Sequence, residues 1–274
     1  MPSHRNFTPA GIGHPRVRRF LDIKHNRGPR AETATTLEGL WAVRCAVHAS
    51  LTFEAVFVCP DLVRGDETTM IIDRLHAADV PAFSVSERVL TRMVDRDGPD
   101  GVAAIAHIRR ARLDDVAVGL TTRLLIAEGF ELDGNLGTVI RCADGSGAAG
   151  VIVTNRQVRL THPLVMKASM GTILSTTVVD AERAGTADWL SRRRVRVVGA
   201  DPSAGLSYRA ADLRGPVAIA VGSERHGLAP FWKDVADATV SIPMRGVADS
   251  LNVGHAAALL LYEALHQTER ERQG

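Results

Sequence analysis

Cysteine is scarce in this 274-residue chain and long apolar runs are missing from it, and each shortage excludes a class of protein. The three cysteines, Cys45, Cys59 and Cys142, are odd in number and far apart, which excludes a disulfide framework and a C-x-x-C metal or redox site. No apolar run reaches the roughly 18 residues of a membrane-spanning helix, and the first residues lack the apolar stretch of a signal peptide. We expect reduced thiols, no membrane contact and a cytoplasmic location.

The net charge of +2 conceals an uneven distribution of charge along the chain. Residues 1–30 carry six Arg and one Lys against the single acid Asp22, so residues 31–274 have a net charge of about −4. A basic arm is typical of proteins that bind a polyanion, because each cation that neutralises a phosphate releases a condensed counterion. A solvated, poorly ordered terminus is the alternative, and charge alone does not decide between the two.

Length and composition indicate a folded protein with two domains. Hydrophobic residues make up 45% and charged residues 23% of the chain, which excludes disordered, collagen-like and coiled-coil proteins. A first α/β unit ends in a charged linker near Arg110. Its expected elements are strands at 54–59, 80–85 and 101–107 and helices at 66–78 and 86–94.

The second unit alternates more regularly between strands and longer connections. Apolar strands are expected at 123–129, 150–154, 195–200, 217–222 and 238–243. Connections long enough for crossover helices predict an α/β fold with a mostly parallel sheet covered on both faces. The last helix is expected from Ser250 to about Gln267, with Asp249 and Ser250 as N-cap candidates. The residues expected in its buried face are Leu251, Ala258, Leu259 and Tyr262.

One apparent cofactor motif lies in the wrong context. Residues 145–150 form a formal G-x-G-x-x-G, but a helical pattern precedes them and a strand follows, the reverse of a dinucleotide-binding unit. We interpret these glycines as a helix end and a turn. The ten histidines show no metal-ligand spacing, and Cys45 and His48, one turn apart, have no second pair. No metal site is expected.

Three segments of the second unit stand out because each follows or adjoins a strand where α/β sheets bind ligands. They are Gly134-Asn135-Leu136-Gly137-Thr138-Val139-Ile140-Arg141, Gly222-Ser223-Glu224-Arg225-His226-Gly227-Leu228, and Ile242-Pro243-Met244-Arg245-Gly246 continuing to Ser250-Leu251-Asn252-Val253. In the first, Asn135 is a candidate helix cap. Taken singly, each segment is explained by turn and capping chemistry, but the three in this order favour a common function.

The three segments resemble the motifs N-x-G-x-x-x-R, G-x-E-x-x-G-L and I-P-M-x-G through S-L-N-V of the SpoU (TrmH-like) family of the SPOUT superfamily. The resemblance covers about residues 120–268. A weaker resemblance, over about 15–107, links the first unit to the family's ribosomal-protein-like RNA-binding domain through LEGLWAV, EAVFVCP and GVAAIAH. The charge distribution indicates a basic arm, placed at 1–14, and the weaker resemblance implies a small α/β RNA-binding domain at 15–110. The family resemblance implies a SPOUT-type parallel-sheet catalytic domain with a trefoil knot at 119–274. It also implies a homodimer with the active site at the interface.

The resemblance implies S-adenosylmethionine as cofactor and ribose 2′-O-methylation of RNA as reaction. The cofactor-binding residues would be Gly222 at the turn, Ile242 and Met244 beside the adenine, and Ser250 and Leu251 in the pocket. The catalytic residues would be Asn135, Arg141, Glu224, Ser250 and Asn252.

A ribose hydroxyl is a poor nucleophile and must lose its proton as it attacks the methyl group. The family proposal makes Arg141 the base, yet a guanidinium stays protonated at accessible pH. Arg141 could instead bind the target phosphate and stabilise the forming alkoxide, with Glu224, Ser250 or a water in proton transfer.

Three positions depart from the commoner family pattern. Asp133-Gly134 replaces a frequent proline, and Lys167, within a segment at 165–171, replaces an arginine but keeps a point charge for RNA. His255 stands where a small residue is usual, and we favour a core position over a substrate contact.

The expected function is methylation of structured RNA. Ribosomal RNA is favoured over tRNA because of the accessory domain, and a large-subunit target would permit either antibiotic resistance or housekeeping modification. The alternatives are a tRNA 2′-O-methyltransferase and a noncatalytic RNA-binding protein of ribosome assembly.

Overall fold

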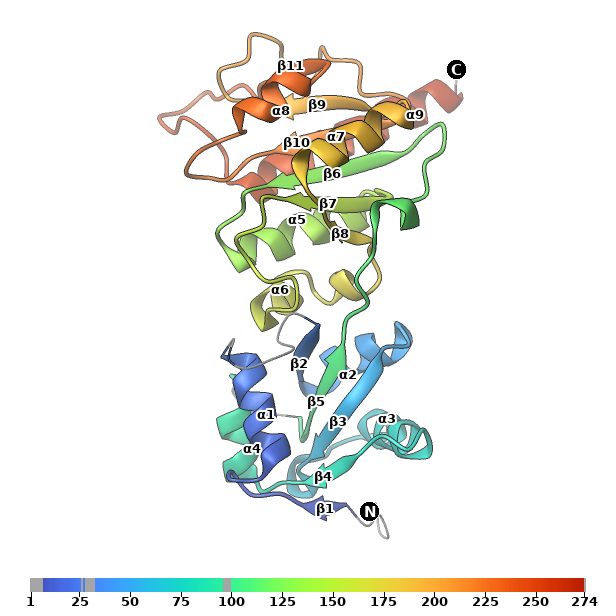
Figure 1. Ribbon diagram of the computed structural model, residues 1–274, viewed down its shortest axis with the longest axis vertical. Helices are drawn as coiled ribbons and strands as arrows, with labels where there is room; N and C mark the ends of the chain where they lie inside the picture. The colour runs from blue at the N-terminus through green and yellow to red at the C-terminus, as the bar shows by residue number, and fades with distance from the viewer. Residues whose placement is uncertain (1–6, 26, 28–32, 96–99, 274) are drawn as a thin grey trace. The chain divides into compact units, whose positions relative to one another are not determined.

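A computed structural model describes residues 7–25, 27, 33–95 and 100–273 of the chain (Figure 1). The chain divides into two compact units. The first comprises residues 1–109 with 160–166, and the second comprises residues 110–159 with 167–274. Among the described helices, none is both long enough and apolar enough to cross a membrane.

The first unit contains a mixed five-stranded sheet in the order β1-β4-β3-β5-β2. β1, β4 and β3 run parallel, and β5 pairs antiparallel with β3 and β2. The strands are β1 (Thr8–Pro9), β2 (Ala34–Glu38), β3 (Thr52–Val58), β4 (Ala82–Ser84) and β5 (Val102–His107). The helices are α1 (Pro15–Lys24), α2 (Gly39–His48), α3 (Asp66–Ala77) and α4 (Glu87–Met93). The five elements expected from residue 54 to residue 107 are confirmed, and β1 and β2 are additions.

Much of the basic N-terminal segment folds into the first unit instead of extending freely from it. β1 pairs with β4, and the core side of α1 is completely buried at Phe20 and its neighbours. Arg16 and Arg19 bind the carboxylate of Glu54 at 2.9 and 3.5 Å. The alternative of a poorly ordered terminus is therefore wrong for β1 and α1. α1 folds onto the core because its apolar residues recur at helical spacing and form one buried side. Residues 1–6 and 28–32 lie outside the described part of the chain.

The second unit contains a six-stranded, all-parallel sheet in the order β11-β9-β10-β6-β7-β8. The strands are β6 (Arg123–Glu128), β7 (Gly150–Thr154), β8 (Val178–Asp180), β9 (Arg196–Ala200), β10 (Val217–Val221) and β11 (Ala238–Val240). The helices are α5 (Asp133–Gly145), α7 (Arg183–Arg192), α8 (Pro230–Val235) and α9 (Val253–Gln273). A further helix, α6 (Pro163–Ala168), is divided between the units, since residues 163–166 belong to the first and residues 167–168 to the second. The predicted parallel sheet is confirmed, and β8 is an edge strand that the sequence analysis missed.

Helices cover both faces of this sheet (Figure 1). On one face, Leu124 and Ala218 pack with Trp189 of α7 and Trp232 of α8 in a continuous core. On the other face, α5 and α9 pack against β6, β7 and β10 and against each other. The G-x-G-x-x-G segment ends α5 at Gly145 and leads into β7, so its interpretation as a helix end and turn is confirmed.

The last helix begins later and buries a different face than we predicted. α9 starts at Val253, and its N-cap is Asn252, whose side-chain oxygen accepts the backbone N–H of Gly254 at 2.9 Å. The prediction that Leu259 and Tyr262 are buried is wrong, since they are 40% and 49% exposed. The buried residues of α9 are Val253, Gly254, Ala257, Leu260, Leu261, Ala264 and Thr268. The run of residues 256–262 is apolar on every side, so its periodicity does not select a face.

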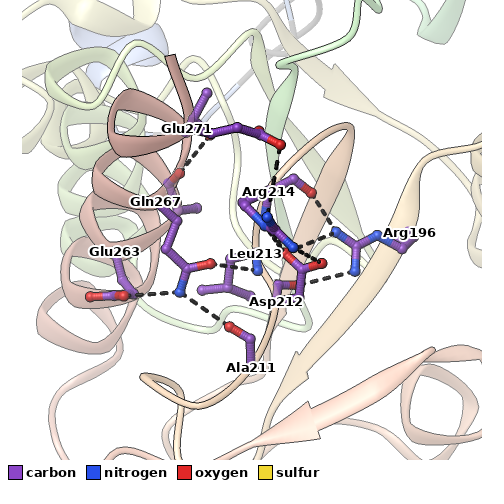
Figure 2. Close-up of polar contacts among 10 residues, drawn as sticks. Arg196, Ala211, Asp212, Leu213, Arg214, Glu263, Gln267 and Glu271 are labelled. Atoms are coloured by element: carbon purple, nitrogen blue, oxygen red, sulfur yellow. Dashed lines mark hydrogen bonds and ion pairs between the residues drawn. The ribbon is translucent and has the colours of Figure 1, made fainter. Parts of the chain in front are cut away.

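The connection between β9 and β10 is fastened to α9 by a polar cluster (Figure 2). The side-chain amide of Gln267 accepts the N–H of Leu213 at 2.9 Å and donates to the carbonyl oxygen of Ala211 at 3.1 Å. Arg214 binds Asp212 at 2.8 Å, and this hydrogen bond is the main reason that the pKa of Asp212 is lowered to about 2. These contacts hold the connection against α9, whose first turn adjoins the site described next.

Candidate active site

A cavity of about 120 Å³ opens at the carboxyl ends of β9, β10 and β11 in the second unit. Parallel strands end at the same edge of a sheet, so the loops that follow these three strands meet there. The loop before α9 supplies the remaining wall. The second and third sequence motifs, widely separated along the chain, therefore contribute to one cavity.

The loop after β10 is closed tightly by its backbone. A Cβ atom on Gly222 would lie 1.9 Å from the carbonyl oxygen of Gly227, so only glycine fits at position 222. The N–H of Gly227 donates to the carbonyl oxygen of Ser223 at 2.8 Å, and the N–H of His226 donates to the Ser223 hydroxyl at 3.2 Å. The loop is thus a compact backbone turn at the edge of the cavity.

Four of the five residues predicted to bind the cofactor line this cavity. They are Gly222, Ile242, Ser250 and Leu251. Met244 is not among the residues that line the cavity, and its contact with the cofactor stays a prediction. It follows Ile242 by two residues and is partly exposed.

The cavity combines an apolar wall with negative charge. Leu228, Val240, Ile242 and Leu251 provide the apolar surface, while Asp201, Glu224 and Asp249 are the acidic members. Within the part of the chain that the structure describes, no Lys, Arg or His side chain lines it. Such a surface favours a ligand with an apolar portion and a positive charge.

Asp201 was not recognised in the sequence, although it directly follows β9, the position where parallel strands present ligand-binding residues. Its carboxylate accepts hydrogen bonds from Lys233 Nζ at 2.6 Å and from the N–H and hydroxyl of Ser203 at 2.9 and 2.8 Å. The Lys233 contact is the largest cause that lowers the pKa of Asp201 to about 2, and burial opposes it. Asp201 is therefore ionised at neutral pH.

Three of the predicted catalytic side chains meet beside the cavity. The amide nitrogen of Asn252 donates to Glu224 Oε1 and also to Asn135 Oδ1, the latter at 3.3 Å. These residues come from the loop before α9, the loop after β10 and α5. Asn135 lies in the first turn of α5 and is not its cap, since the N-cap is Leu132. The predicted capping role of Asn135 is therefore wrong, which leaves its side chain available to Asn252.

A second cavity, of about 140 Å³, lies on the other side of Glu224. Phe130 and Leu132 line it together with Asn135, and Ser223, Glu224 and Val253 line both cavities. The exposed carboxylate of Glu224, held by Asn252, thus stands on the wall that the two cavities share. Two ligands in adjacent cavities would meet at this wall.

The two remaining predicted catalytic residues differ in position. Ser250 lines the first cavity, and its hydroxyl donates to Asp249 Oδ1 at 3.2 Å. Arg141 is exposed and lines neither cavity. It follows Asn135 by six residues in α5, which places the two side chains about 120° apart around the helix axis. The structure of one chain does not bring Arg141 to the other four residues.

Other candidates from the sequence lie on the surface. His255 is exposed, so the prediction of a core histidine is wrong, because the buried stripe of α9 passes through Val253 and Ala257 instead. Lys167 is exposed in α6. Among the described residues, no group of His, Cys, Asp and Glu has the arrangement of a metal site.

A buried polar cluster supports the loop that precedes α5. Glu128, at the end of β6 and 2% exposed, accepts hydrogen bonds from the hydroxyl of Thr154 at 2.6 Å, Trp232 Nε1 at 3.0 Å and Arg183 Nε at 3.0 Å. Burial alone would raise the pKa of Glu128, but these donors outweigh it and lower the pKa overall. The cluster ties β6, β7, α7 and α8 together just before the first motif.

Comparison with known proteins gives a consistent result. The SpoU rRNA Methylase family model matches residues 122–262, about half of the chain. The 23S rRNA (uridine(2479)-2′-O)-methyltransferase of Streptomyces viridochromogenes is 32% identical over 177 residues, which are 62% of each chain. The chain therefore spans less than two thirds of this relative.

Two solved structures share the fold over nearly the whole chain. A crystal structure of an RNA 2′-O ribose methyltransferase has a TM-score of 0.79 and 35% identity, with coverage of 95% of this chain and 99% of that one. An AdoMet-bound rRNA methyltransferase from Sinorhizobium meliloti has a TM-score of 0.85 and 24% identity, with coverage of 94% and 96%. The α/β fold class, with a SPOUT-type parallel-sheet domain and a smaller N-terminal domain, is confirmed. The trefoil knot stays a prediction.

Proposed function

Because the chain belongs to the SpoU rRNA methylase family of RNA 2′-O-methyltransferases, we propose that it transfers a methyl group from S-adenosylmethionine to a ribose of ribosomal RNA. The observation that carries this proposal is the position of Glu224. Its carboxylate lies on the wall between two cavities and is held there by Asn252. Methyl transfer requires the methyl donor and the acceptor hydroxyl to be in contact beside a group that can accept the hydroxyl proton. The wall between the two cavities provides such a group.

The residues of the first cavity fit S-adenosylmethionine. The apolar side chains of Ile242 and Leu251 suit an adenine ring, and Gly222 allows the tight turn that forms this edge of the cavity. The acidic lining suits the sulfonium charge. When bound, the cofactor supplies an electrophilic methyl group on that sulfonium.

The second cavity fits the target nucleotide, and Glu224 is our choice of proton acceptor. The ribose 2′-hydroxyl oxygen forms a bond to the methyl carbon as the carbon–sulfur bond breaks, and the hydroxyl proton passes to the Glu224 carboxylate directly or through a water. The charge balance is complete, because the sulfonium becomes a neutral thioether as the proton is released. Asn252 orients the acceptor by donating to Glu224, and it also contacts Asn135.

We infer that the active unit is a homodimer, since Arg141 lies outside both cavities of its own chain. Exposed apolar side chains on α9, Leu259 and Tyr262, lie on the helix that packs against α5. A second copy covering these two helices would remove that apolar surface from water and bring one protomer's Arg141 toward the other protomer's site. There a guanidinium would bind the target phosphate and stabilise the forming alkoxide.

Ribosomal RNA is the favoured substrate, and the first unit and the N-terminal segment bind it. The reaction takes place in the cytoplasm. The Streptomyces viridochromogenes relative is a 23S rRNA methyltransferase, which supports a large-subunit target and with it a role in antibiotic resistance or in housekeeping modification.

The proposal is tested by the E224Q variant, with D234N as a matched control at an exposed acid that lines neither cavity. E224Q should bind S-adenosylhomocysteine normally but lose single-turnover methyl transfer by about 100-fold, a typical loss for a general base. D234N should keep transfer within about threefold of wild type, since the same loss of one negative charge occurs outside the site. Normal transfer by E224Q would overturn the assignment of Glu224.

A further inference from the structure

Asp201 carries a ligand-facing carboxylate that none of the three motifs includes. It lines the first cavity, and its side chain is 14% exposed. Lys233 and Ser203 hold it with three hydrogen bonds, and neither is among the described residues that line the cavity. The carboxylate is thus fixed from behind by protein donors while it borders the space of the ligand.

The position of Asp201 in the sheet separates it from the reacting end of the cavity. β9, which Asp201 follows, lies between β11 and β10. Glu224 follows β10 and is linked through Asn252 to Asn135. Asn135 belongs to α5, which follows β6 on the other side of β10. Asp201 therefore stands on the side of β11, which pairs with β9 and ends at Val240, two residues before Ile242. This is the side with apolar residues suited to the adenine, away from the shared wall.

The chemistry of this end of the ligand calls for an acceptor. A ribose presents two neighbouring hydroxyl donors, and an ionised carboxylate is an acceptor with two oxygens. An acidic residue near the end of a parallel strand binds ribose hydroxyls in other α/β folds. We propose that Asp201 accepts hydrogen bonds from the ribose hydroxyls of S-adenosylmethionine. The inference rests on the cofactor of the proposed function.

Two ligands separate this contact from the alternatives. S-adenosylhomocysteine and methylthioadenosine share the adenosine ribose, but only the first carries the charged amino-acid end. We expect D201N to weaken the binding of both ligands by a similar factor, about tenfold or more, as measured by calorimetry or competition. Weaker binding of S-adenosylhomocysteine alone would place the carboxylate at the amino-acid end and overturn the proposal, and so would unchanged binding of both.

A matched control and a second variant complete the test. K233M removes the ion pair but leaves the carboxylate at the cavity, so it should change both affinities by less than about threefold. An equal loss in K233M and D201N would show that loop anchoring, and not a ribose contact, is responsible. Thermal melting without ligand reports whether each variant folds. If D201N does not fold, D201S, which also removes the carboxylate, gives the same comparison. Failure of wild type to bind either ligand would instead contradict the proposed function itself.

Discussion

Asn252 joins the start of α9 to the acid at the centre of the site. Its amide nitrogen donates to Glu224, while its amide oxygen caps α9 at the N–H of Gly254, 2.9 Å away. The amide oxygen of Asn252 thus caps the helix, and its amide nitrogen contacts Glu224. Because the two contacts use different atoms, substitutions can remove one and keep the other.

The first prediction concerns N252D and N252S, which keep a capping oxygen but lose the amide N–H that donates to Glu224. Both variants should melt close to wild type, since Asp and Ser are good N-caps. N252D should be the less active of the two, with methyl transfer reduced by about 100-fold. It places a second carboxylate against Glu224, and repulsion between the two favours a protonated Glu224 that cannot accept the hydroxyl proton. Melting curves and single-turnover rates check this. Equal activity of N252D and wild type would contradict a role for the Asn252–Glu224 contact.

The second prediction compares two glycines of one loop. In G222A the new Cβ would meet the carbonyl of Gly227 at 1.9 Å, so the loop must open and binding of S-adenosylhomocysteine should fall beyond detection. In G227A no atom lies within 4 Å of the new Cβ, and the cost is only the backbone strain of φ +64°, about 1 kcal/mol. Calorimetric titration of both variants should show G227A binding and G222A not binding. The reverse order would refute the described loop geometry.

The third prediction uses the buried acid Glu128. Its folded pKa is lowered, so its contribution to stability is present at neutral pH and is lost as the pH falls through the folded value. E128Q should be less stable than wild type at pH 7, by about 2 kcal/mol, and the difference should shrink toward acidic pH. E128A, which leaves Trp232 and Thr154 without their acceptor, should lose about 3 kcal/mol. Denaturant unfolding from pH 7 to pH 3 measures both, and a difference that grows on acidification would contradict the assignment.

The fourth prediction tests the partner role of Arg141 by subunit complementation. R141A and E224Q should each be inactive alone. If Arg141 serves the neighbouring protomer, a mixed dimer has both defects in one site and an intact second site, so random mixing should restore about a quarter of wild-type activity. If Arg141 serves its own chain, mixed dimers have two damaged sites and no activity returns. Mixing and re-forming the dimers before a transfer assay distinguishes the two outcomes.

Much of the catalytic domain follows from local sequence pattern. The strands of the parallel sheet are continuous apolar runs bounded by turn residues, so the sequence predicts them well. Glycines directly after a strand, such as Gly222, indicate tight loops at the strand ends. The meeting of Asn135, Glu224 and Asn252 was expected from the family resemblance, and the structure places them together. Their catalytic roles stay a prediction.

The remaining features depend on tertiary structure and had no local signal. The buried side of α9 is set by its packing on α5 and the sheet, because the residues around Leu259 are apolar on every side. Asp201 and Glu128 are single acids at strand ends, and their partners Lys233 and Trp232 are distant in sequence. Arg141 lies outside both cavities of its own chain, and its proposed place in a partner's site has no signal in a single sequence.

The most direct measurement is transfer of labelled methyl groups from S-adenosylmethionine to total rRNA and, separately, to tRNA, followed by nucleoside analysis of the product. We predict a 2′-O-methylated nucleoside in the rRNA pool with wild type and label that appears about 100-fold more slowly with E224Q. Label in tRNA alone would keep the reaction and move the substrate to tRNA. Absence of transfer to both pools together with absence of S-adenosylmethionine binding would contradict a methyltransferase and favour a noncatalytic RNA-binding protein.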